Sequence, residues 1–276
     1  MLHTPSPIRL RSWLLAPLPQ PHARPLWADL DARADWSFNV TDEIRSSRDF
    51  GFFHGVAGDA GLQLAPGAGV LDFGCGDGTS VATWRAAGYD AYGCDITLEQ
   101  PTEHLRLIET PYRVPFDDNT FDLVVSNQVF EHVQNPDVAF AEIRRVLKPG
   151  GLSLHVFPAR WNPIEVHSRV PFASVIQSYP WLVIWARLGL RNHFQSSKPW
   201  REVARLNTDF LRSQTSYPTR RQLRRVAGRY FRRVEFPDLL TLKHGNRTRR
   251  LYPVAKALPP LAWAYGGMRA RTMLLS

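Results

Sequence analysis

The fold of this chain is decided by the stretch Gly69–Gly78, which reads GVLDFGCGDG. Its first half, Val70–Phe73, is apolar apart from one carboxylate, as in a short buried strand. Its second half alternates glycine with other residues, and glycine lets the chain turn sharply and lets a ligand approach the backbone. Residues 79–87 favour a helix, which Gly88 can end. The stretch therefore predicts a strand, a ligand-binding turn and a helix.

Strands and helices continue to alternate along the chain. Apolar runs predict further strands at residues 90–94, 123–125, 152–157 and 231–236, and a last strand within 268–275. Helical patterns fall at residues 136–147, after the capping residue Asn135, at 219–228, and at 254–265, where Pro259 and Pro260 interrupt the pattern. This alternation predicts a Rossmann-like, doubly wound α/β sheet whose strands are mostly parallel.

The chain is expected to form one domain over residues 27–276. Residues 1–26 carry six prolines, which remove backbone donors and fix φ, so they are predicted to be a poorly ordered arm. Residues 158–218 are rich in Trp, Pro and Arg and too long for a simple connection. They are predicted to be a helical insertion after the fifth strand that forms a lid and substrate pocket. Pro17 ends the short apolar run 13–16, which argues against a secretory signal.

Composition excludes several classes of protein. The 276 residues have a mean hydropathy of −0.27 and contain no long uncharged apolar run, which argues against a transmembrane protein. The only two cysteines, Cys75 and Cys94, cannot make a disulfide scaffold or a multi-cysteine metal site. No metal site is predicted, and a reducing, cytoplasmic compartment is expected.

The net charge of +9 is unevenly distributed. Residues 187–276 contain 20 Lys and Arg against 4 Asp and Glu, a net charge of +16, whereas residues 1–186 carry −7. Seven arginines crowd the predicted helix at 219–228 and the strand after it: Arg220, Arg221, Arg224, Arg225, Arg229, Arg232 and Arg233. They fit either a solvated helix face or an anionic partner, which would be a phosphorylated or lipid-linked substrate, a membrane surface or RNA.

Two carboxylates flank the glycine turn at informative positions. Asp95 closes the next predicted strand, 21 residues after Gly74, where a carboxylate can accept hydrogen bonds from both ribose hydroxyls. Asp72 stands two residues before Gly74 and suits an ammonium group better than a pyrophosphate. The glycine spacing is G-x-G-x-G rather than G-x-G-x-x-G, because residue 79 is Thr. The pattern favours S-adenosylmethionine (SAM) over NAD, so an NAD-dependent oxidoreductase is the disfavoured interpretation.

Three further motifs follow in order. Residues 114–124 read VPFDDNTFDLV, residues 127–133 read NQVFEHV, and residues 145–151 read RVLKPGG. Together with the glycine turn, they resemble the class I SAM-dependent methyltransferases, closest to the methyltransferase type 11-like, small-molecule family. The resemblance runs from about Gly69 to Phe157. It implies a seven-stranded, mostly parallel sheet and methyl transfer from SAM.

The resemblance also implies cofactor contacts. The methionine part of SAM would contact Asp72, Gly74, Cys75, Gly76 and Gly78, the ribose would contact Asp95, and the adenine would lie beside Ile96. Asn127 lies where the fourth strand opens toward the methyl group. The family often has an acidic residue for the adenine amino group ahead of the 114–124 motif, but Thr110, Pro111 and Tyr112 stand there. This contact is left to Thr110, to backbone or to Tyr112.

Methyl transfer needs few side chains, because the sulfonium of SAM already activates the methyl group. Positioning and exclusion of water supply most of the effect, and a base is added when an acceptor oxygen must lose its proton. His132 and His167 are the candidate bases, since His titrates near neutral pH. Structural alternatives stay open: a helix-start residue for His132, a solvated or capping residue for Glu131, and a surface pair or cap for Glu165 to His167.

The acceptor is expected to be a small molecule, a glycan or a lipid-linked intermediate, methylated at oxygen, and the basic half of the chain favours an anionic one. Trp161, Trp181, Trp185 and Trp200 could stack on sugars or dip into a membrane interface, so a peripheral membrane contact is also predicted. Nucleic acid is disfavoured, because no binding module is recognised and residues 127–130 read NQVF instead of D/N-P-P-Y/F. An RNA or DNA methyltransferase and a SAM-binding protein without catalysis are the alternatives. No oligomeric state is predicted.

Overall fold

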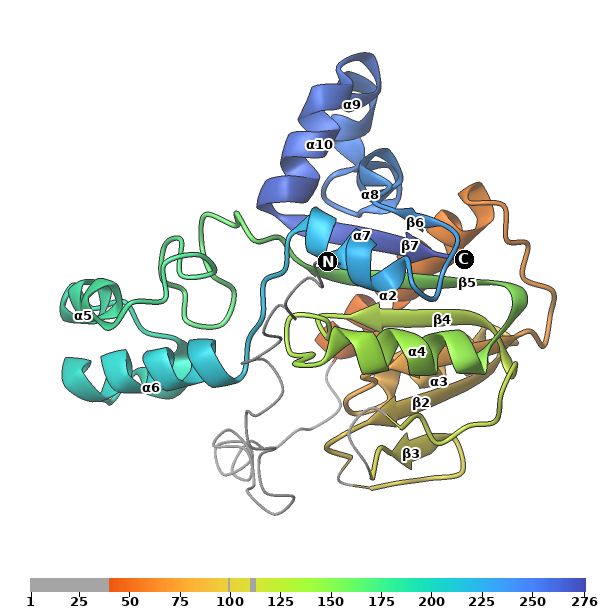
Figure 1. Ribbon diagram of the computed structural model, residues 1–276, viewed down its shortest axis with the longest axis horizontal. Helices are drawn as coiled ribbons and strands as arrows, with labels where there is room; N and C mark the ends of the chain where they lie inside the picture. Colours follow the sequence, from red (N-terminus) through yellow and green to blue (C-terminus); the bar gives the residue numbers. More distant parts are fainter. Residues whose placement is uncertain (1–39, 99, 110–112) are drawn as a thin grey trace, which may run out of the picture. The chain divides into compact units, whose positions relative to one another are not determined.

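The computed structural model describes the backbone of residues 40–98, 100–109 and 113–276, and the side chains of these ranges from Ser47 onward (Figure 1). The predicted arm at residues 1–26 lies outside this part of the chain, as do Thr110, Pro111 and Tyr112. No helix among the described residues is long and apolar enough to cross a membrane.

The centre of the structure is a seven-stranded sheet, as predicted. Its order is β3 (Leu105–Leu107), β2 (Asp90–Asp95), β1 (Gly69–Phe73), β4 (Phe121–Asn127), β5 (Leu147–Pro158), β7 (Ala270–Leu275) and β6 (Val234–Glu235). The first five strands in this order pair in parallel, and β7 runs antiparallel to both β5 and β6. The predicted mostly parallel, Rossmann-like sheet is therefore confirmed.

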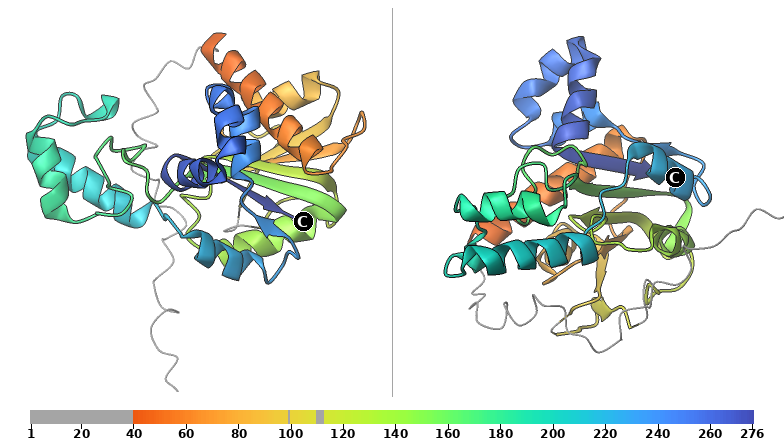
Figure 2. Two further views of the ribbon diagram at one scale, coloured as in Figure 1. Left: turned by 90° about the horizontal axis from the view of Figure 1, so that it is seen from above. Right: turned by 60° about the vertical axis from the view of Figure 1, so that its left-hand side comes forward.

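Helices cover both faces of the sheet (Figure 2). One face carries α2 (Val40–Asp59), α3 (Thr79–Ala86) and α8 (Asp238–His244), and the other carries α4 (Pro136–Val146) and α7 (Arg220–Ala227). Successive β1 residues point to opposite cores: Val70 packs with Trp84 of α3, and Leu71 packs in the cluster that holds Ile143 of α4. This alternation follows from the period of two in a strand. It explains why the central strands are apolar on both sides.

The order of the strands reverses between β1 and β4, because β2 lies on one side of β1 and β4 lies on the other. The connections that leave the carboxyl ends of these strands diverge there, and ligands of open α/β sheets bind in that crevice. Asp72 near the end of β1, Asp95 at the end of β2 and Asn127 at the end of β4 all lie at this edge. The topology thus brings the predicted cofactor residues together.

The insertion after β5 contains α5 (Tyr179–Arg187), the 3-10 turn η1 (His193–Gln195) and α6 (Trp200–Ser213). The two helices lie side by side in Figure 1, and small apolar clusters of their own hold them together. Trp181 and Trp185 pack edge to face with ring centroids 5.6 Å apart, and Trp200 lies between the guanidinium groups of Arg187 and Arg201. The predicted helical insertion is confirmed, and three of its tryptophans pack within it.

The C-terminal part contains one element that differs from the prediction and one that agrees with it. The strand expected at 231–236 is only the two-residue β6, because Phe231 is buried in the core cluster beside α4 and α7 instead of entering the sheet. The helical pattern expected at 254–265, with its interruption at Pro259 and Pro260, is confirmed as two helices, α9 (Tyr252–Ala257) and α10 (Pro259–Met268), which follow the short turn η2 (Arg249–Leu251). Strand β3 was not predicted, because its three residues contain no apolar run.

Candidate functional site

The glycine turn after β1 has the backbone conformation that its sequence requires. Gly74, Gly76 and Gly78 have φ angles of +80°, +56° and +81°, which residues with a side chain rarely adopt. A Cβ on Gly74 would collide with Val129, and a Cβ on Gly78 would collide with Leu105. A Cβ on Gly76 would meet nothing within 4 Å. The turn therefore packs closely on two sides and leaves open space at Gly76, where a ligand can approach.

Cys75 lies within this turn, but its side chain points into the core. The residue is 7% exposed, and burial raises the pKa of its thiol. Its backbone N–H and that of Gly74 both donate to the carbonyl of Cys94, at 3.2 and 2.8 Å, and hold the turn against the end of β2. Any contact of Cys75 with a cofactor must therefore use its backbone.

Asp72 is a buried carboxyl group at the floor of the site. Burial raises its pKa to about 7, and the negative charges of Asp95 and Asp49 add to the shift, while a hydrogen bond from Ser80 opposes it. A carboxylate held in such surroundings gains most from a cationic partner. The prediction that this position suits an ammonium group is therefore retained for the proposal below.

Asp95 is held in place by three hydrogen bonds from the surrounding turns. Its Oδ2 accepts from the Gly76 N–H at 2.9 Å, and its Oδ1 accepts from the Thr97 N–H and hydroxyl at 3.1 and 3.2 Å. A carboxylate has about four lone-pair sites, so acceptor capacity is left for a diol. The neighbouring Ile96 is 64% exposed and offers an apolar surface to a planar ring.

A residue that the sequence did not predict completes this edge of the sheet. Asn127 donates from Nδ2 to Oδ2 of Asp49 in α2, at 2.9 Å. The two residues are 78 positions apart, and nothing local to Asp49 marks it as a site residue. Its position beside Asn127 is a consequence of the way α2 packs across the strand ends.

A cavity of about 470 Å³ opens beside this pair. Asp49 and Phe52 of α2 and Asn127 of β4 line it, together with Arg247 and Tyr265 from the C-terminal part. Arg48 also lines it, so two guanidinium groups border the cavity. The sequence analysis did not predict Arg48 or Arg247 as a site residue.

The two candidate bases lie next to each other, although they are 35 residues apart in the chain. The ring centroids of His132 and His167 are 4.9 Å apart, and Phe210 of α6 packs against both rings. His132 Nδ1 donates to the carbonyl of Gln214 at 2.8 Å, because a carbonyl can only accept. Burial lowers the pKa of both imidazoles, which favours their neutral, proton-accepting form.

The interpretation of Glu131 as a solvated or capping residue is wrong. Its exposed fraction is 0%, and neither carboxylate oxygen has a hydrogen-bond partner among the described residues. Burial raises its pKa to about 8. Glu131 lies beside the two histidines, and the carboxylate oxygen and the imidazole nitrogens lie within 4.8 Å of one another. The backbone carbonyl of Glu131 accepts a hydrogen bond from the Ser216 N–H at 2.6 Å, so a segment 85 residues later packs against it.

The interpretation of Glu165 as part of a surface pair is also wrong. Glu165 is 1% exposed and accepts hydrogen bonds from the His167 N–H, from the N–H and hydroxyl of Ser168 and from the hydroxyl of Tyr217. The Ser168 and Tyr217 hydroxyl bonds are both 2.6 Å long. Glu165 therefore closes the loop that carries His167 and anchors it to the segment after α6.

Comparison with known proteins identifies the same part of the chain. Residues 71–154 match the family model described as a methyltransferase domain. Malonyl-[acyl-carrier protein] O-methyltransferase from Herminiimonas arsenicoxydans is 36% identical over 130 residues, which cover 41% of this chain and 50% of that protein. Demethylmenaquinone methyltransferase from Parafrankia sp. is 30% identical over 133 residues, covering 38% and 52%. The chain spans about half the length, or less, of the curated relatives it matches.

Among solved structures, geranyl diphosphate C-methyltransferase from Streptomyces coelicolor A3(2) is 17% identical, with a TM-score of 0.44 and coverage of 84% of this chain and 78% of that one. The family match runs from β1 into β5 and includes Asp72, Asp95 and Asn127. It ends before the insertion, so the surroundings of His167 and the C-terminal helices lie outside it.

Proposed function

We propose that this chain, which belongs to the class I SAM-dependent methyltransferases as its motifs predicted, transfers the methyl group of SAM to an oxygen of a small-molecule, glycan or lipid-linked acceptor. The family match supports the reaction type, and the motifs that resemble SAM-dependent enzymes support the cofactor. The acceptor and the methylated atom are our proposal. The observation that carries it is the adjacent pair His132 and His167. His132 lies in the segment that follows β4, and His167 lies in the insertion that follows β5.

The cofactor half would hold SAM by charge and shape. In this arrangement the ammonium group lies against Asp72, the ribose hydroxyls donate to Asp95, and the adenine packs on Ile96. The backbone of the glycine turn lies against the methionine part, because only its open side at Gly76 leaves room. Asn127, fixed by Asp49, borders the end from which the methyl group leaves.

The acceptor half would supply the base and exclude water. A hydroxyl acceptor must lose its proton as its oxygen attacks the methyl carbon, and a neutral imidazole can take that proton. His167 Nε2 is buried and has no hydrogen-bond partner among the described residues, so it is available for this role. Phe210 covers both rings from the side of α6, in keeping with the insertion acting as a lid. A SAM-binding protein without catalysis would not need this pair.

A lipid-linked acceptor is supported by the surface of the C-terminal helices. Residues 239–270 contain six Lys and Arg and no Asp or Glu. Large apolar side chains are exposed on η2, α9 and α10 beside these charges, including Leu251, Val254, Leu258, Leu261, Trp263 and Met268. Figure 1 shows α9 at the far end of this group from the sheet, with α10 leading from it to the start of β7. Exposed apolar groups among cationic ones are typical of a surface that rests on anionic lipid. We propose a peripheral membrane contact here.

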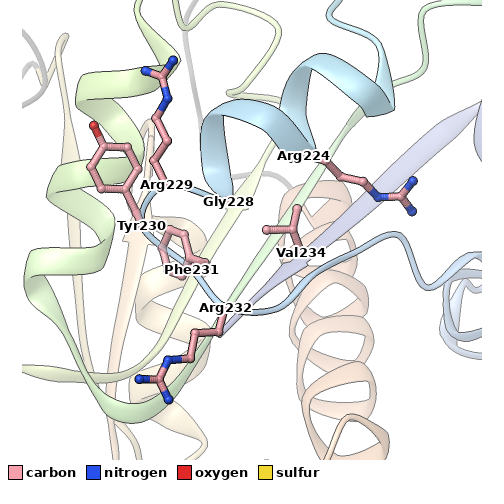
Figure 3. A pocket seen from close by; sticks show the side chains of 7 residues that line it. All are labelled: Arg224, Gly228, Arg229, Tyr230, Phe231, Arg232 and Val234. Atoms are coloured by element: carbon pink, nitrogen blue, oxygen red, sulfur yellow. The ribbon is translucent and has the colours of Figure 1, made fainter.

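An anionic group on the acceptor is supported by the cavity of about 470 Å³ that lies between Asn127 and the C-terminal helices. Arg48 and Arg247 border it, and it reaches from Asn127 toward the C-terminal helices. The arginine-rich segment around α7 supports an anion site much less. A hollow of about 570 Å³ lies there, but Arg224, Arg229 and Arg232 point away from one another in Figure 3, and Arg229 pairs with Asp137 at 2.8 Å. These arginines fit a solvated helix face better than a phosphate or nucleic-acid site.

The proposal is tested by incubating the full chain with isotopically labelled SAM and with fractionated lipid and polar extracts, and by identifying the labelled product by mass. We expect label in a product of the lipid fraction that resists mild base, as an ether does. The matched control is Asp95→Ala, which should form no product. A wild-type chain that binds SAM but labels no fraction would contradict catalysis and favour the alternative of a binding protein.

A further inference from the structure

We infer that Glu131, His132 and His167 form a binding site for a divalent transition-metal cation. One ligand atom from each residue lies within 4.8 Å of the other two. Two ligands of one ion with bonds of about 2.0–2.2 Å lie at most about 4.4 Å apart, so metal binding would draw these side chains inward. Two imidazoles and one carboxylate are a recurring ligand set for such ions in proteins. The sequence did not predict this site.

The polar atoms at this cluster lack partners that a cation would supply. Both carboxylate oxygens of Glu131 and Nε2 of His167 are buried without a hydrogen bond to any described residue. Buried polar atoms are nearly always paired, so three orphaned acceptors at one point need an explanation. A metal ion accounts for all three at once, because each of these atoms can donate a lone pair to it.

The surroundings orient the histidines as ligands. His132 donates its Nδ1–H to the Gln214 carbonyl, which directs the lone pair of Nε2 to the opposite side of the ring. Metal-binding histidines almost always donate their other N–H in this way, to a carbonyl or a carboxylate. The backbone of His167 is held by Glu165, whose carboxylate accepts the His167 N–H at 3.1 Å. Phe210 packs against both rings.

The ligand atoms indicate the class of ion. Magnesium and calcium prefer all-oxygen sites, whereas imidazole nitrogen suits zinc, cobalt, iron and copper. Three protein ligands leave at least one position for water or for an acceptor oxygen. The ion and the acceptor's proton would use the same Nε2 lone pair of His167, so His167 can act as the base only in the metal-free chain. Binding of the ion does not depend on methyl transfer, and only its contact with the acceptor rests on the proposed function.

The test uses the full chain without a histidine tag, stripped with a chelator and titrated with Co²⁺, whose visible absorption reports nitrogen ligation directly. We expect one equivalent to bind with a visible band, and Zn²⁺ to displace it. Glu131→Gln and His167→Ala should each weaken Co²⁺ binding by about 100-fold or more, beyond the roughly 10- to 100-fold typical of outer-shell changes. His193→Ala is the matched control, because this histidine is exposed on the same insertion and should leave binding unchanged.

The proposal is overturned if the wild-type chain binds Co²⁺ no more tightly than Glu131→Gln does, or if the His193→Ala variant loses binding equally. SAM binding by each variant, measured by calorimetry, shows that the fold is intact. Should His167→Ala fail that control, His167→Gln replaces it in the same titration. Failure of SAM binding in the wild-type chain would contradict the proposed function and would leave the Co²⁺ result standing on its own.

Discussion

Between β1 and β5, the proposed cofactor residues lie at the ends of neighbouring strands, whereas the residues proposed for the acceptor side come from segments far apart in the chain. Asp72 and Asp95 each stand within a few residues of a glycine turn or a strand end. His132 meets His167 only because the insertion folds back over the segment after β4. The charge follows the same division, −7 over residues 1–186 and +16 over residues 187–276. The comparison indicates that the proposed cofactor site depends on short-range sequence, whereas the proposed acceptor site depends on tertiary packing.

The largest expected effect is on the acceptor side. His167→Ala should lower turnover by about 10²- to 10⁴-fold, as loss of a general base does, while SAM affinity stays within about twofold of wild type. Calorimetry with SAM and product formation with labelled SAM measure the two quantities separately. His193→Ala, on the same insertion, is the control. Turnover equal to wild type would remove His167 from the mechanism and would leave the acceptor half without an identified base.

The next effect is on the cofactor side. Asp72→Asn should weaken SAM binding by roughly 100-fold, because the ammonium group of SAM would lose a buried charged partner. The same change should raise the melting temperature of the chain without SAM at pH 8. The folded pKa of about 7 lies above the ordinary 3.8, so the stability that Asp72 contributes is present below pH 3.8 and is lost as the pH rises to 7. Asp117→Asn, at an exposed site, should change neither quantity.

A third prediction concerns pH and uses the same carboxyl group. Below pH 7, Asp72 is protonated in the chain without ligand and must release its proton to bind a cation. SAM affinity should therefore fall by up to about tenfold for each pH unit below 7 and level off above it. Titrations in buffers of different ionisation enthalpy count the released protons. A flat profile in the wild-type chain would show that the ammonium group does not meet Asp72; the Asp72→Asn variant should be flat in any case.

The smallest expected effect is at the C-terminal helices. Trp263 is 66% exposed, and Trp263→Ala should weaken binding to phosphatidylglycerol vesicles severalfold, because Trp is a strong interfacial anchor. Trp161→Ala is the matched control, since Trp161 is 57% exposed on the insertion. Sedimentation with phosphatidylglycerol and with phosphatidylcholine vesicles separates charge from apolar contact. Equal losses for both variants would refute a specific role for α10.

The sheet and the glycine turn could be predicted because their signals are short-range. The strand at Val70–Phe73, the glycine turn and the cap at Asn135 depend on neighbours a few residues away, and all three are confirmed. The two-residue strand β6 and the strand β3 were misjudged, since the burial of Phe231 and the pairing of Leu105 with Gly93 depend on distant partners.

The missed site residues share one physical cause. Asp49 acts through Asn127, 78 residues away, and Glu131 is buried by the insertion, which begins more than twenty residues later. Nothing in the sequence around Asp49 or Glu131 distinguishes these residues from acidic residues that are exposed to solvent. Tertiary packing decides which carboxylates become part of a site, and one sequence without its fold does not contain that information in readable form.

The central claim is that the strand ends hold SAM, and calorimetric titration with SAM and with NADH tests it most directly. We expect SAM to bind at one site in the wild-type chain, NADH not to bind, and Asp95→Ala to lose most of the SAM affinity because the ribose contact is gone. Binding of NADH without SAM, or unchanged SAM affinity in Asp95→Ala, would contradict the account.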